Sequence, residues 1–425
     1  MAIAAIVDGV RTPFAKAGTV LKDQSVVDLG CTVTKELLAR NEFDPRRLTE
    51  VIFGNVSQPA DSANVARVIA LFSGIPWNIP AFSVHRNCAS SIESVVQGAR
   101  MIWHEGAEAV LVGGVESMSN IPLMFNKKMK GFFEKLMSAK TPFQKLRALL
   151  RFRPSFLAPE IALVQGLTDP YVEMIMGLTA DRVAKDFKIT RQEQDAYALE
   201  SHRRAVRSMK NGIFAEEIVP VYTKDGVVLQ DKGPREDQSL EKLASLKPYF
   251  DRKYGTVTVG NACPVTDGGV ALLLMNAEKA KAEGREILGT IKSYAFAALD
   301  PSRMGLGPAF AIPIALERAG LRLEELDVIE LNEAFAAQVL GCLRAMDSET
   351  FCREKMNRPR VGLLDPARIN VNGGAIALGH PVGATGGRII LTALKELKRK
   401  GGRYALASLC VGGGQGAAVV LERGA

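Results

Sequence analysis

Two long segments of the chain repeat the same order of strand, turn, helix and glycine, and this internal duplication restricts the fold more than any other feature. The first is AFSVHRNCASSIESVVQGARMIWHEGAEAVLVGG at 81–114, and the second is RINVNGGAIALGHPVGATGGRIILTALKELKRKGGRYALASLCVGGG at 368–414. A shorter pair, LTEVIFGN at 48–55 and LDVIELN at 326–332, gives a strand that ends at Asn in both places. We therefore expect two related halves, with a chance likeness between ordinary α/β segments as the alternative.

Extending the comparison predicts five strands in each half. They lie near 2–7, 50–55, 81–84, 109–113 and 270–275 in the first half, and near 287–295, 327–331, 368–372, 403–409 and 417–422 in the second. Short apolar strands that alternate with helices predict mainly parallel pairing with helices on both faces. Two such sheets that share a central helical layer form a five-layer stack.

The first half carries an extra stretch at roughly 116–265, and its early part holds the charge of the protein. The net charge is +8, from 54 basic and 46 acidic residues. Residues 127–153 contain nine Lys or Arg and one Glu, so the remaining chain holds 45 of each and its net charge is zero. The charge is therefore not evidence for nucleic-acid binding.

Two amphipathic helices are predicted within 127–153. One has apolar residues at helical spacing, and a second begins at Thr141-Pro142, because Pro is tolerated at a first helical position. Three interpretations remain open: the stripe lies on an anionic membrane as a peripheral attachment, docks on a partner such as a hydratase–dehydrogenase subunit, or covers the protein's own acyl pocket. The apolar residues are Met129, Phe132, Phe133, Leu136 and Met137 in the first helix, and Phe143, Leu146, Leu149 and Leu150 in the second.

The composition is that of an ordinary globular protein, with 47% apolar and 24% charged residues. No stretch reaches the ~18 consecutive apolar residues of a membrane span. The start, MAIAAIVDGVRTPF, does not resemble a signal peptide, and the end, LERGA, carries no lipidation or peroxisomal signal. Six cysteines without a Cys-x-x-Cys pair do not indicate a disulfide framework or a zinc ribbon. We expect a cytoplasmic protein.

Cys88 and His380 are the first candidates for chemistry. Cys88 follows an apolar strand and opens a helix, whose N-terminal N–H groups favour thiolate over thiol. A buried, inert cysteine is the alternative. His380 sits in GHPVGATGG, where small residues let backbone or ligand approach closely. Among the other histidines, His104 and His202 fall on charged helices and are predicted to be solvated.

Cys410 and Asn332 complete the candidate set. Cys410 ends a strand and precedes a glycine run whose N–H groups could face a substrate oxygen. That run fits neither a phosphate loop nor Gly-x-Gly-x-x-Gly. Asn332 follows the strand VIEL, where a helix cap is the simpler interpretation. Because ligands bind at the carboxyl ends of strands in α/β sheets, we expect the four residues to share one pocket if the halves pack symmetrically.

These motifs resemble the thiolases, a family that includes 3-oxoacyl-CoA thiolase and acetyl-CoA acetyltransferase. The resemblance runs from VDGVRTPFAKAGT at 7–19 to the C-terminus. It includes NCASS at 87–91, GGVESMS at 113–119, MGLTAD at 176–181, GTVTVGNACPVTDGG at 255–269, MGLGP at 304–308, NEAFAAQ at 332–338, NGGAIALGHPVGATGGR at 372–388 and CVGGGQG at 410–416.

The resemblance implies an α/β fold of duplicated five-stranded mixed sheets in a five-layer αβαβα stack with an inserted loop domain. We expect an N-terminal half at 1–120, completed by about 178–275, an inserted region at 121–177 and a C-terminal half at 276–425. The resemblance also implies a homodimer or a dimer of dimers.

The resemblance assigns a role to each candidate. Cys88 would be the nucleophile that carries the acyl group as a thioester, and His380 would accept its proton and then bind a substrate carbonyl oxygen. Cys410 would move a proton at the α-carbon of the acetyl unit. Asn332 would hold a water in one oxyanion hole with His380, and the backbone N–H groups of Cys88 and Gly412 would form the other.

The implied reaction is CoA-dependent cleavage of 3-oxoacyl-CoA to acetyl-CoA and a shortened acyl-CoA, as in fatty-acid β-oxidation. Coenzyme A is a substrate, and no metal or prosthetic group is expected. Five further residues are expected to contact substrate or CoA: Met176, Cys263, Met304, Ala334 and Phe335. The alternatives are synthesis of acetoacetyl-CoA from acetyl-CoA, a condensing enzyme that lacks the second cysteine, and an inactive CoA-binding scaffold.

Three departures from common thiolase patterns stand out. Ser91 occupies the place of a frequent Gly after the nucleophile, and Cys263 replaces a Ser common in short-chain thiolases. The 120–175 region resembles the thiolase subunit of the trifunctional complex, although such subunits often carry His at the position of Asn332.

Overall fold

The two predicted halves form one continuous sheet in the computed structural model, which describes residues 2–424. The strand order is β14-β15-β16-β13-β1-β12-β5-β3-β4, and the short β2 (Ala15–Lys16) pairs with β12 beside this path. The halves join where β1 pairs with β13, through Ala5 with Thr290 and Ile6 with Gly289. The strands are β1 (Ala4–Arg11), β3 (Glu50–Gly54), β4 (Ala81–Val84), β5 (Ala109–Glu116), β12 (Thr266–Asn276), β13 (Gly289–Ala298), β14 (Val328–Leu331), β15 (Tyr404–Val411) and β16 (Gln415–Glu422).

The pattern of strand pairing is similar in the two halves, and it contradicts two predictions. Parallel pairs occur only where β3 meets β4 and β5, and where β14 meets β15, so the sheet is mixed and not mainly parallel. One reason is the three-residue connection at 412–414, since so short a link allows only an antiparallel hairpin. The expected strand at 368–372 is a single bridge between Ile369 and Ile329. Asn370, with φ of 46°, ends the extended conformation there.

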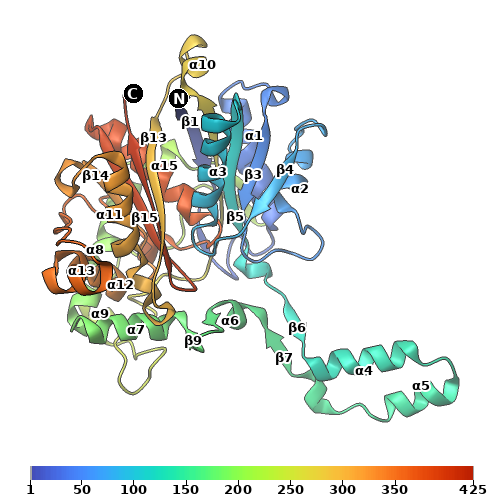
Figure 1. Ribbon diagram of the computed structural model, residues 1–425. Coiled ribbons are helices and arrows are strands. Elements are labelled where there is room, and N and C mark those ends of the chain that lie inside the picture. The colour runs from blue at the N-terminus through green and yellow to red at the C-terminus, as the bar shows by residue number, and fades with distance from the viewer. Residues whose placement is uncertain (1, 425) are drawn as a thin grey trace.

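The two halves of the sheet form two layers. Helices lie outside each half and between the halves, which gives the expected five layers (Figure 1). The outer helices are α1 (Val26–Arg40) and α2 (Val65–Phe72) on the first half, and α11 (Gly307–Ala319) and α12 (Ala336–Asp347) on the second. The central layer consists of α3 (Ser90–His104) and α15 (Thr385–Lys400), the helices of the duplicated segments. They pack against each other and against strands of both halves, with Ile92 and Leu394 in one shared apolar core. Burial of this core provides the main stabilisation.

The remaining helices and strands lie outside these layers. They are α6 (Ala162–Gly166), β8 (Thr168–Asp169), β9 (Met174–Ile175), α7 (Met176–Asp186), α8 (Arg191–Lys210), β10 (Val221–Thr223), β11 (Gly226–Val228), α9 (Leu240–Ala244), α10 (Ala277–Ala282), α13 (Glu349–Met356) and α14 (Ala375–Leu378). Among them, α10 lies against β1 and β12. Short 3-10 turns occur at 45–47, 118–120, 154–157, 213–216, 301–306 and 323–325.

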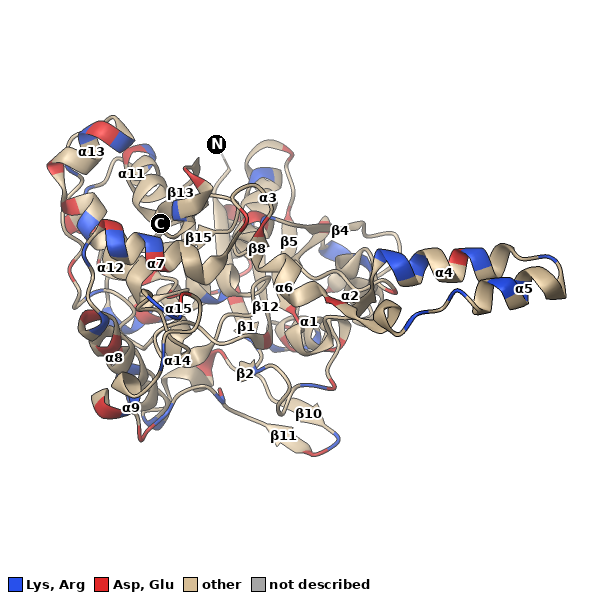
Figure 2. Cartoon of the chain, turned by 90° about the horizontal axis from the view of Figure 1, so that it is seen from below, with Lys and Arg blue, Asp and Glu red and all other residues tan. Residues whose placement is uncertain are grey.

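Residues 121–161, called the arm below, project away from the layered body (Figures 1 and 2). A two-stranded stalk of β6 (Leu123–Phe125) and β7 (Pro159–Ile161) carries α4 (Lys127–Ser138) and α5 (Pro142–Leu149). Pro142 occupies the first turn of α5 and Thr141 caps it, as predicted. None of the helices in residues 2–424 is long and apolar enough to cross a bilayer.

Candidate active site

A pocket of about 380 Å³ brings together nearly all the residues predicted from the sequence. It lies where loops follow the carboxyl ends of β4 and β15, the location that α/β sheets favour for ligands. Asn332 is the one predicted side chain that does not line it. The predicted residues that do are Cys88, Met176, Cys263, Met304, Ala334, Phe335, His380, Cys410 and Gly412.

Cys88 is held in a tight turn between β4 and α3. Asn87 takes the left-handed conformation, with φ of 44°, and its amide Nδ2 donates to the carbonyl oxygen of Gly412 at 2.8 Å. The Ser90 hydroxyl accepts from the Arg86 N–H at 2.9 Å and donates to the Asn87 carbonyl at 2.7 Å. These contacts orient the thiol and tie its loop to the β15–β16 hairpin.

The structure reverses one expectation about Cys88. Burial raises the pKa of its thiol to about 11, and the backbone N–H groups of Gly412 and of Cys88 itself oppose this only in part. Because the desolvation cost exceeds the stabilisation from these donors, the resting sulfur is a thiol rather than the predicted thiolate. These are the same two N–H groups that were predicted to form the backbone oxyanion hole.

His380 is buried and presents one free ring nitrogen. Its Nδ1 lies 2.6 Å from the Thr385 hydroxyl, which donates to the Pro381 carbonyl at 3.0 Å. The hydroxyl's single hydrogen is then used, so Nδ1 carries the proton and donates to Thr385. Nε2 is left with a lone pair, and it has no hydrogen-bond partner among the described residues. Burial, aided by Arg388, lowers the pKa of His380 to about 3, so the ring is a neutral base.

Two further thiols share the pocket with Cys88. Cys410 is fully buried near the end of β15, and burial followed by the neighbouring thiols raises its pKa well above the usual range. Cys263 is fixed by its N–H, which donates to the Ala334 carbonyl at 3.0 Å. Burial, together with Cys88, raises its pKa to about 12. All three sulfurs therefore hold protons at neutral pH, and any of them acts as a nucleophile only after it gives up a proton.

Asn332 lies behind the pocket wall, with 1% of its surface exposed. Neither polar atom of its amide has a partner among the described residues. The symmetry-related Asn55 differs, because its Nδ2 donates to the Val115 carbonyl at 3.0 Å. A buried amide without a partner is costly, so the unpaired Asn332 indicates a place for an ordered water.

The next residue, Glu333, fixes the loops around Asn332. Its carboxylate accepts from Ser201 Oγ at 2.6 Å, Asn370 Nδ2 at 2.9 Å and Tyr197 OH at 3.1 Å. The Ile376 N–H donates to it at 3.2 Å. A carboxylate with four donors holds α8, β14 and the segment before His380 in one arrangement.

One wall of the pocket, and the carboxylate that supports another wall, were not predicted from the sequence. The wall comes from α6 and the following residues, and the apolar run IALVQGL at 161–167 was the available signal. The carboxylate is Glu116, which accepts from the N–H groups of Ser57 and Gly383, both at 2.9 Å. Burial raises its pKa to about 7. It thereby joins the loop after β3 to the loop after His380.

The structure also shows where Ser91 and two of the other histidines lie. Ser91, the departure from Gly, accepts from the Gly387 N–H at 2.8 Å and so links the starts of α3 and α15. His202 is buried and not solvated; its Nδ1 accepts from the Arg235 N–H at 3.2 Å, and burial lowers its pKa to about 4. His104 is exposed, as predicted.

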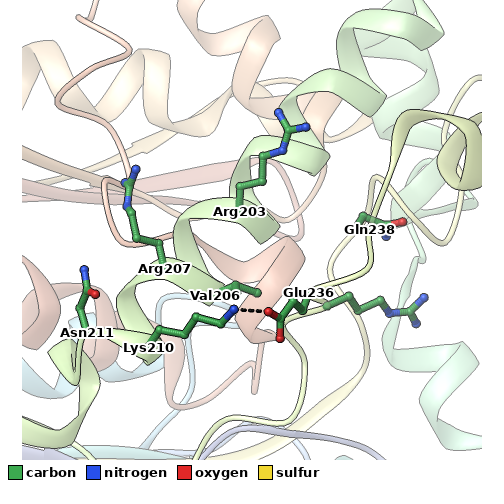
Figure 3. Close-up of a pocket in the computed structure, with 8 residues that line it drawn as sticks. Arg203, Val206, Arg207, Lys210, Asn211, Glu236 and Gln238 are labelled. Atoms are coloured by element: carbon green, nitrogen blue, oxygen red, sulfur yellow. Dashed lines mark hydrogen bonds and ion pairs between the residues drawn. The ribbon is translucent and has the colours of Figure 1, made fainter.

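A second pocket, of about 460 Å³, lies on α8 away from the catalytic candidates (Figure 3). Its lining includes Arg203, Arg207, Lys210 and Arg235 against one acid, Glu236, which pairs with Lys210. The zero net charge of the body therefore conceals a local basic cluster. Because these side chains are exposed to water, their mutual repulsion is weak.

Comparison with known proteins gives matches over almost the whole chain. Residues 4–278 match the thiolase N-terminal domain family, and 285–423 match the thiolase C-terminal domain family. The 3-ketoacyl-CoA thiolase of Aliivibrio fischeri (strain MJ11) is 40% identical over 422 residues, covering 98% of this chain and 95% of the relative. That of Yersinia enterocolitica is 39% identical over 98% of this chain and 96% of the relative.

Solved structures agree with this result. The human mitochondrial 3-ketoacyl-CoA thiolase has a TM-score of 0.87 and 36% identity, covering 100% of this chain and 99% of that one. The Bacillus anthracis acetyl-CoA acetyltransferase has a TM-score of 0.86 and 36% identity, covering 99% of each chain.

Proposed function

This chain belongs to the thiolase family, and on that basis we propose that it cleaves 3-oxoacyl-CoA with coenzyme A, giving acetyl-CoA and an acyl-CoA shortened by two carbons. The observation that supports it most is the single pocket that is lined by three thiols and by a neutral histidine with a free Nε2, where the backbone N–H groups of Cys88 and Gly412 oppose the rise in the pKa of the Cys88 thiol. The sequence relatives described above are 3-ketoacyl-CoA thiolases, which favours cleavage in β-oxidation over acetoacetyl-CoA synthesis.

In the first half of the reaction, Cys88 attacks carbon 3 of the substrate. Its proton passes to Nε2 of His380, and the new C–S bond forms as the carbonyl oxygen gains charge between the N–H groups of Cys88 and Gly412. The bond between carbons 2 and 3 then breaks, which leaves the shortened acyl group on Cys88. The departing enolate of acetyl-CoA is stabilised by protonated His380 and the water on Asn332, and it takes its proton from Cys410.

The second half releases the acyl group. Cys410, now a thiolate, accepts the proton of an incoming coenzyme A thiol. The coenzyme A sulfur attacks the thioester, the bond to Cys88 breaks, and protonated His380 returns its proton to the leaving sulfur. Every thiol regains its proton, so the cycle needs no oxidant and no other cofactor. Met176, Cys263, Met304, Ala334 and Phe335 are proposed to contact the substrate and CoA.

Substrates of increasing chain length test this proposal. The purified chain is expected to release acetyl-CoA from 3-oxoacyl-CoA of 4, 10 and 16 carbons only when coenzyme A is added. The pocket and the apolar wall at α6 favour the longer chains, so kcat/KM is expected to rise with length by about tenfold or more, since each buried CH₂ contributes ~0.8 kcal/mol. Absence of coenzyme A-dependent cleavage at every length would exclude the proposed activity.

We further propose that two copies pair through β4, the strand at one end of the sheet. Phe82 on this edge is exposed, as are Phe72 and Trp77 nearby, and β4 runs directly into the Cys88 loop. An exposed apolar edge favours pairing with a second strand. Sedimentation equilibrium is expected to give twice the chain mass of 45.9 kDa. Phe82→Lys is expected to raise the dimer Kd by about 100-fold through a buried charge, whereas Tyr222→Lys, on exposed β10, leaves it unchanged. A monomeric wild type would contradict this.

The arm supports a second, coarser proposal: it attaches the enzyme to an anionic surface. Residues 127–153 of the arm carry the whole charge excess of the chain and stand clear of the body (Figure 2). No residue of 127–153 lines the catalytic pocket, so the interpretation that this stripe covers the acyl pocket is wrong. Phe132 of α4 instead packs on Phe152 and Phe156 in a small core within the arm.

A further inference from the structure

Glu116, at the end of β5, is a buried carboxylate that takes no part in the reaction steps above. Its side chain accepts from four uncharged N–H groups. Oε1 accepts from the Ser57 N–H at 2.9 Å and from Asn55 Nδ2 at 3.3 Å. Oε2 accepts from the Gly383 N–H at 2.9 Å and from the Val56 N–H at 3.1 Å. Burial of a charge is costly, and these donors offset part of that cost.

The backbone donors belong to segments that form the catalytic pocket. Val56 and Ser57, on the loop after β3, line the pocket directly, and so does His380, three residues before Gly383. Glu116 lies behind these residues, outside the pocket lining. Because the loop after β3 comes from the first half of the chain and Gly383 from the second, one carboxylate connects the pocket walls of both halves.

The donor from Gly383 lies within the turn that holds the base. The turn runs from His380 to Thr385, whose N–H donates to the Pro381 carbonyl at 3.0 Å. Thr385 also provides the hydroxyl that accepts the Nδ1 proton of His380. The Gly383 N–H points out of this turn to Glu116. A displacement of Gly383 would therefore move both the imidazole and the acceptor that fixes its tautomer.

The backbone around this carboxylate is packed too closely to shift freely. A Cβ atom at Gly114 would overlap the Gly383 carbonyl oxygen, and one at Gly54 would lie 2.5 Å from the Ser90 carbonyl carbon. Ser90 is the first residue of α3, two residues after Cys88. The ends of β3 and β5 therefore contact both the loop of the nucleophile and the turn of the base.

We propose that Glu116 is a positioning residue for thiolysis: as a carboxylate it holds the His380 turn and the loop after β3 in place around Cys88, and protonation loosens this arrangement. An ionised carboxylate accepts at both oxygens, whereas a protonated one turns an O–H toward the N–H groups that it held. Nε2 of His380 must lie within hydrogen-bond reach of the thiol, so a small displacement lowers kcat. This inference rests on the proposed function.

The charges around Glu116 set the pH at which it acts. Burial raises the pKa of Glu116 to about 7, the three backbone N–H groups oppose this rise, and the charge of Asp267 adds to it. Asp267 lies on the neighbouring strand β12, Cys88 precedes α3 and His380 precedes α15, while β3 is followed by the uncharged Asn55. Burial also raises the pKa of Asp267. The pKa values of His380 and Cys88, about 3 and about 11, lie far from neutrality.

The pH dependence of kcat tests the proposal. With saturating four-carbon 3-oxoacyl-CoA and coenzyme A, wild-type kcat is expected to fall below pH 7, approaching tenfold per unit, as Glu116 becomes protonated. Glu116→Gln is expected to have a kcat about 10- to 100-fold lower at pH 8, without this decrease, since its amide does not ionise. Glu116→Asp keeps the charge and is expected to keep the decrease, with an intermediate kcat.

Two control variants assign the decrease to Glu116. Asp267→Asn is expected to keep it but to move it to lower pH, because the charge that raises the pKa of Glu116 is removed. Glu217→Gln changes another buried carboxylate, paired with Arg11 outside the pocket, and is expected to keep the wild-type profile. A glutamine variant of Glu116 that retains the decrease, or a kcat within about threefold of wild type at pH 8, would overturn the proposal. If that variant does not fold, the wild-type profile decides, since a constant kcat between pH 6 and pH 8 also overturns it.

Hydrogen exchange at His380 separates this inference from the proposed reaction. In the full chain with ¹⁵N-labelled histidine, the Nδ1–H that donates to Thr385 is expected to exchange slowly with D₂O, and His380→Ala assigns its signal. At pH 8, exchange is expected to be at least about tenfold faster in Glu116→Gln and within about threefold of wild type in Glu217→Gln. Equal exchange in Glu116→Gln and wild type would overturn the positioning role. If wild type cleaves no 3-oxoacyl-CoA, the proposed reaction fails, while the exchange rate still decides whether Glu116 positions His380.

Discussion

Cys88→Ala is expected to lower the rate of coenzyme A-dependent cleavage by at least about 10⁴-fold, to near the uncatalysed rate. The alanine lacks the atom that carries the acyl group, and no other atom of its side chain can form the thioester. The measurement is acetyl-CoA release at saturating substrate. Folding is checked by thermal unfolding, where removal of one sulfur from a half-buried site is expected to matter little.

The matched control is Cys31→Ser, because Cys31 is also half-buried and free but lies on the outer helix α1. It is expected to keep wild-type activity. The intact enzyme gives an independent check: with a pKa of about 11, alkylation of Cys88 by iodoacetamide speeds up about tenfold per pH unit from 7 to 9. A rate that levels off below pH 8 would show a thiolate stabilised in the resting enzyme, and activity above one hundredth of wild type in the alanine variant would exclude Cys88 as the nucleophile.

His380→Ala is the second variant with a large expected effect, a loss of about 10³- to 10⁵-fold in kcat. The variant removes both the base for Cys88 and a donor to the enolate oxygen, and general-base catalysis alone contributes 10²–10⁴-fold. Free imidazole is expected to restore part of the rate, since the emptied site adjoins the pocket. Thr385→Val, which removes only the acceptor of the Nδ1 proton, is expected to cost about 10- to 100-fold and to respond little to imidazole.

The pH dependence of stability checks the protonation state of His380. Its pKa is about 3 in the folded chain and about 6.5 when unfolded, so the folded state binds fewer protons. The contribution to the unfolding free energy is fully present above pH 6.5 and is lost as the pH falls toward 3, by up to about 1.4 kcal/mol per unit. In the His380→Ala variant, this part of the decrease in the unfolding free energy between pH 6.5 and pH 3 is expected to be absent. If the alanine variant keeps both the wild-type dependence of the unfolding free energy on pH and the wild-type activity, His380 is neither buried as a neutral ring nor the base.

The duplicated pattern predicted most of the architecture because each element has a local cause. Apolar spacing placed the helix that begins near Ser90 and the one that ends at Gly401, whose φ of 67° only glycine adopts readily. The prediction of a strand at 368–372 was wrong, because the left-handed backbone conformation of Asn370 ends the extended segment and apolar spacing does not reveal such a conformation. Parallel pairing was overestimated because strand direction depends on how the chain returns, as in the short turn at 412–414.

The candidate site, like the fold, was predicted from the sequence only in part. Residue types and motifs selected Cys88, His380, Cys410 and Asn332, because thiols beside glycine and a histidine in a Gly-His-Pro turn are unusual in a packed core. The protonation states required the three-dimensional structure. A helix start suggests a thiolate at Cys88, but the desolvation cost depends on how many atoms surround the sulfur, and these come from distant segments. Glu116 and the wall at 162–170 were missed because they act through long-range contacts.

By itself, the sequence determined the duplication, the family, the four catalytic candidates and the location of the whole charge excess in 127–153. These follow from residue identity and short-range periodicity, which the chain carries without folding. Only the tertiary structure decided that the three thiols and His380 face one pocket, that the thiols stay protonated, and that the charged helices stand away from the body with several of their apolar residues exposed. Proximity, burial and exposure depend on packing between segments far apart in the chain, and no local pattern encodes them.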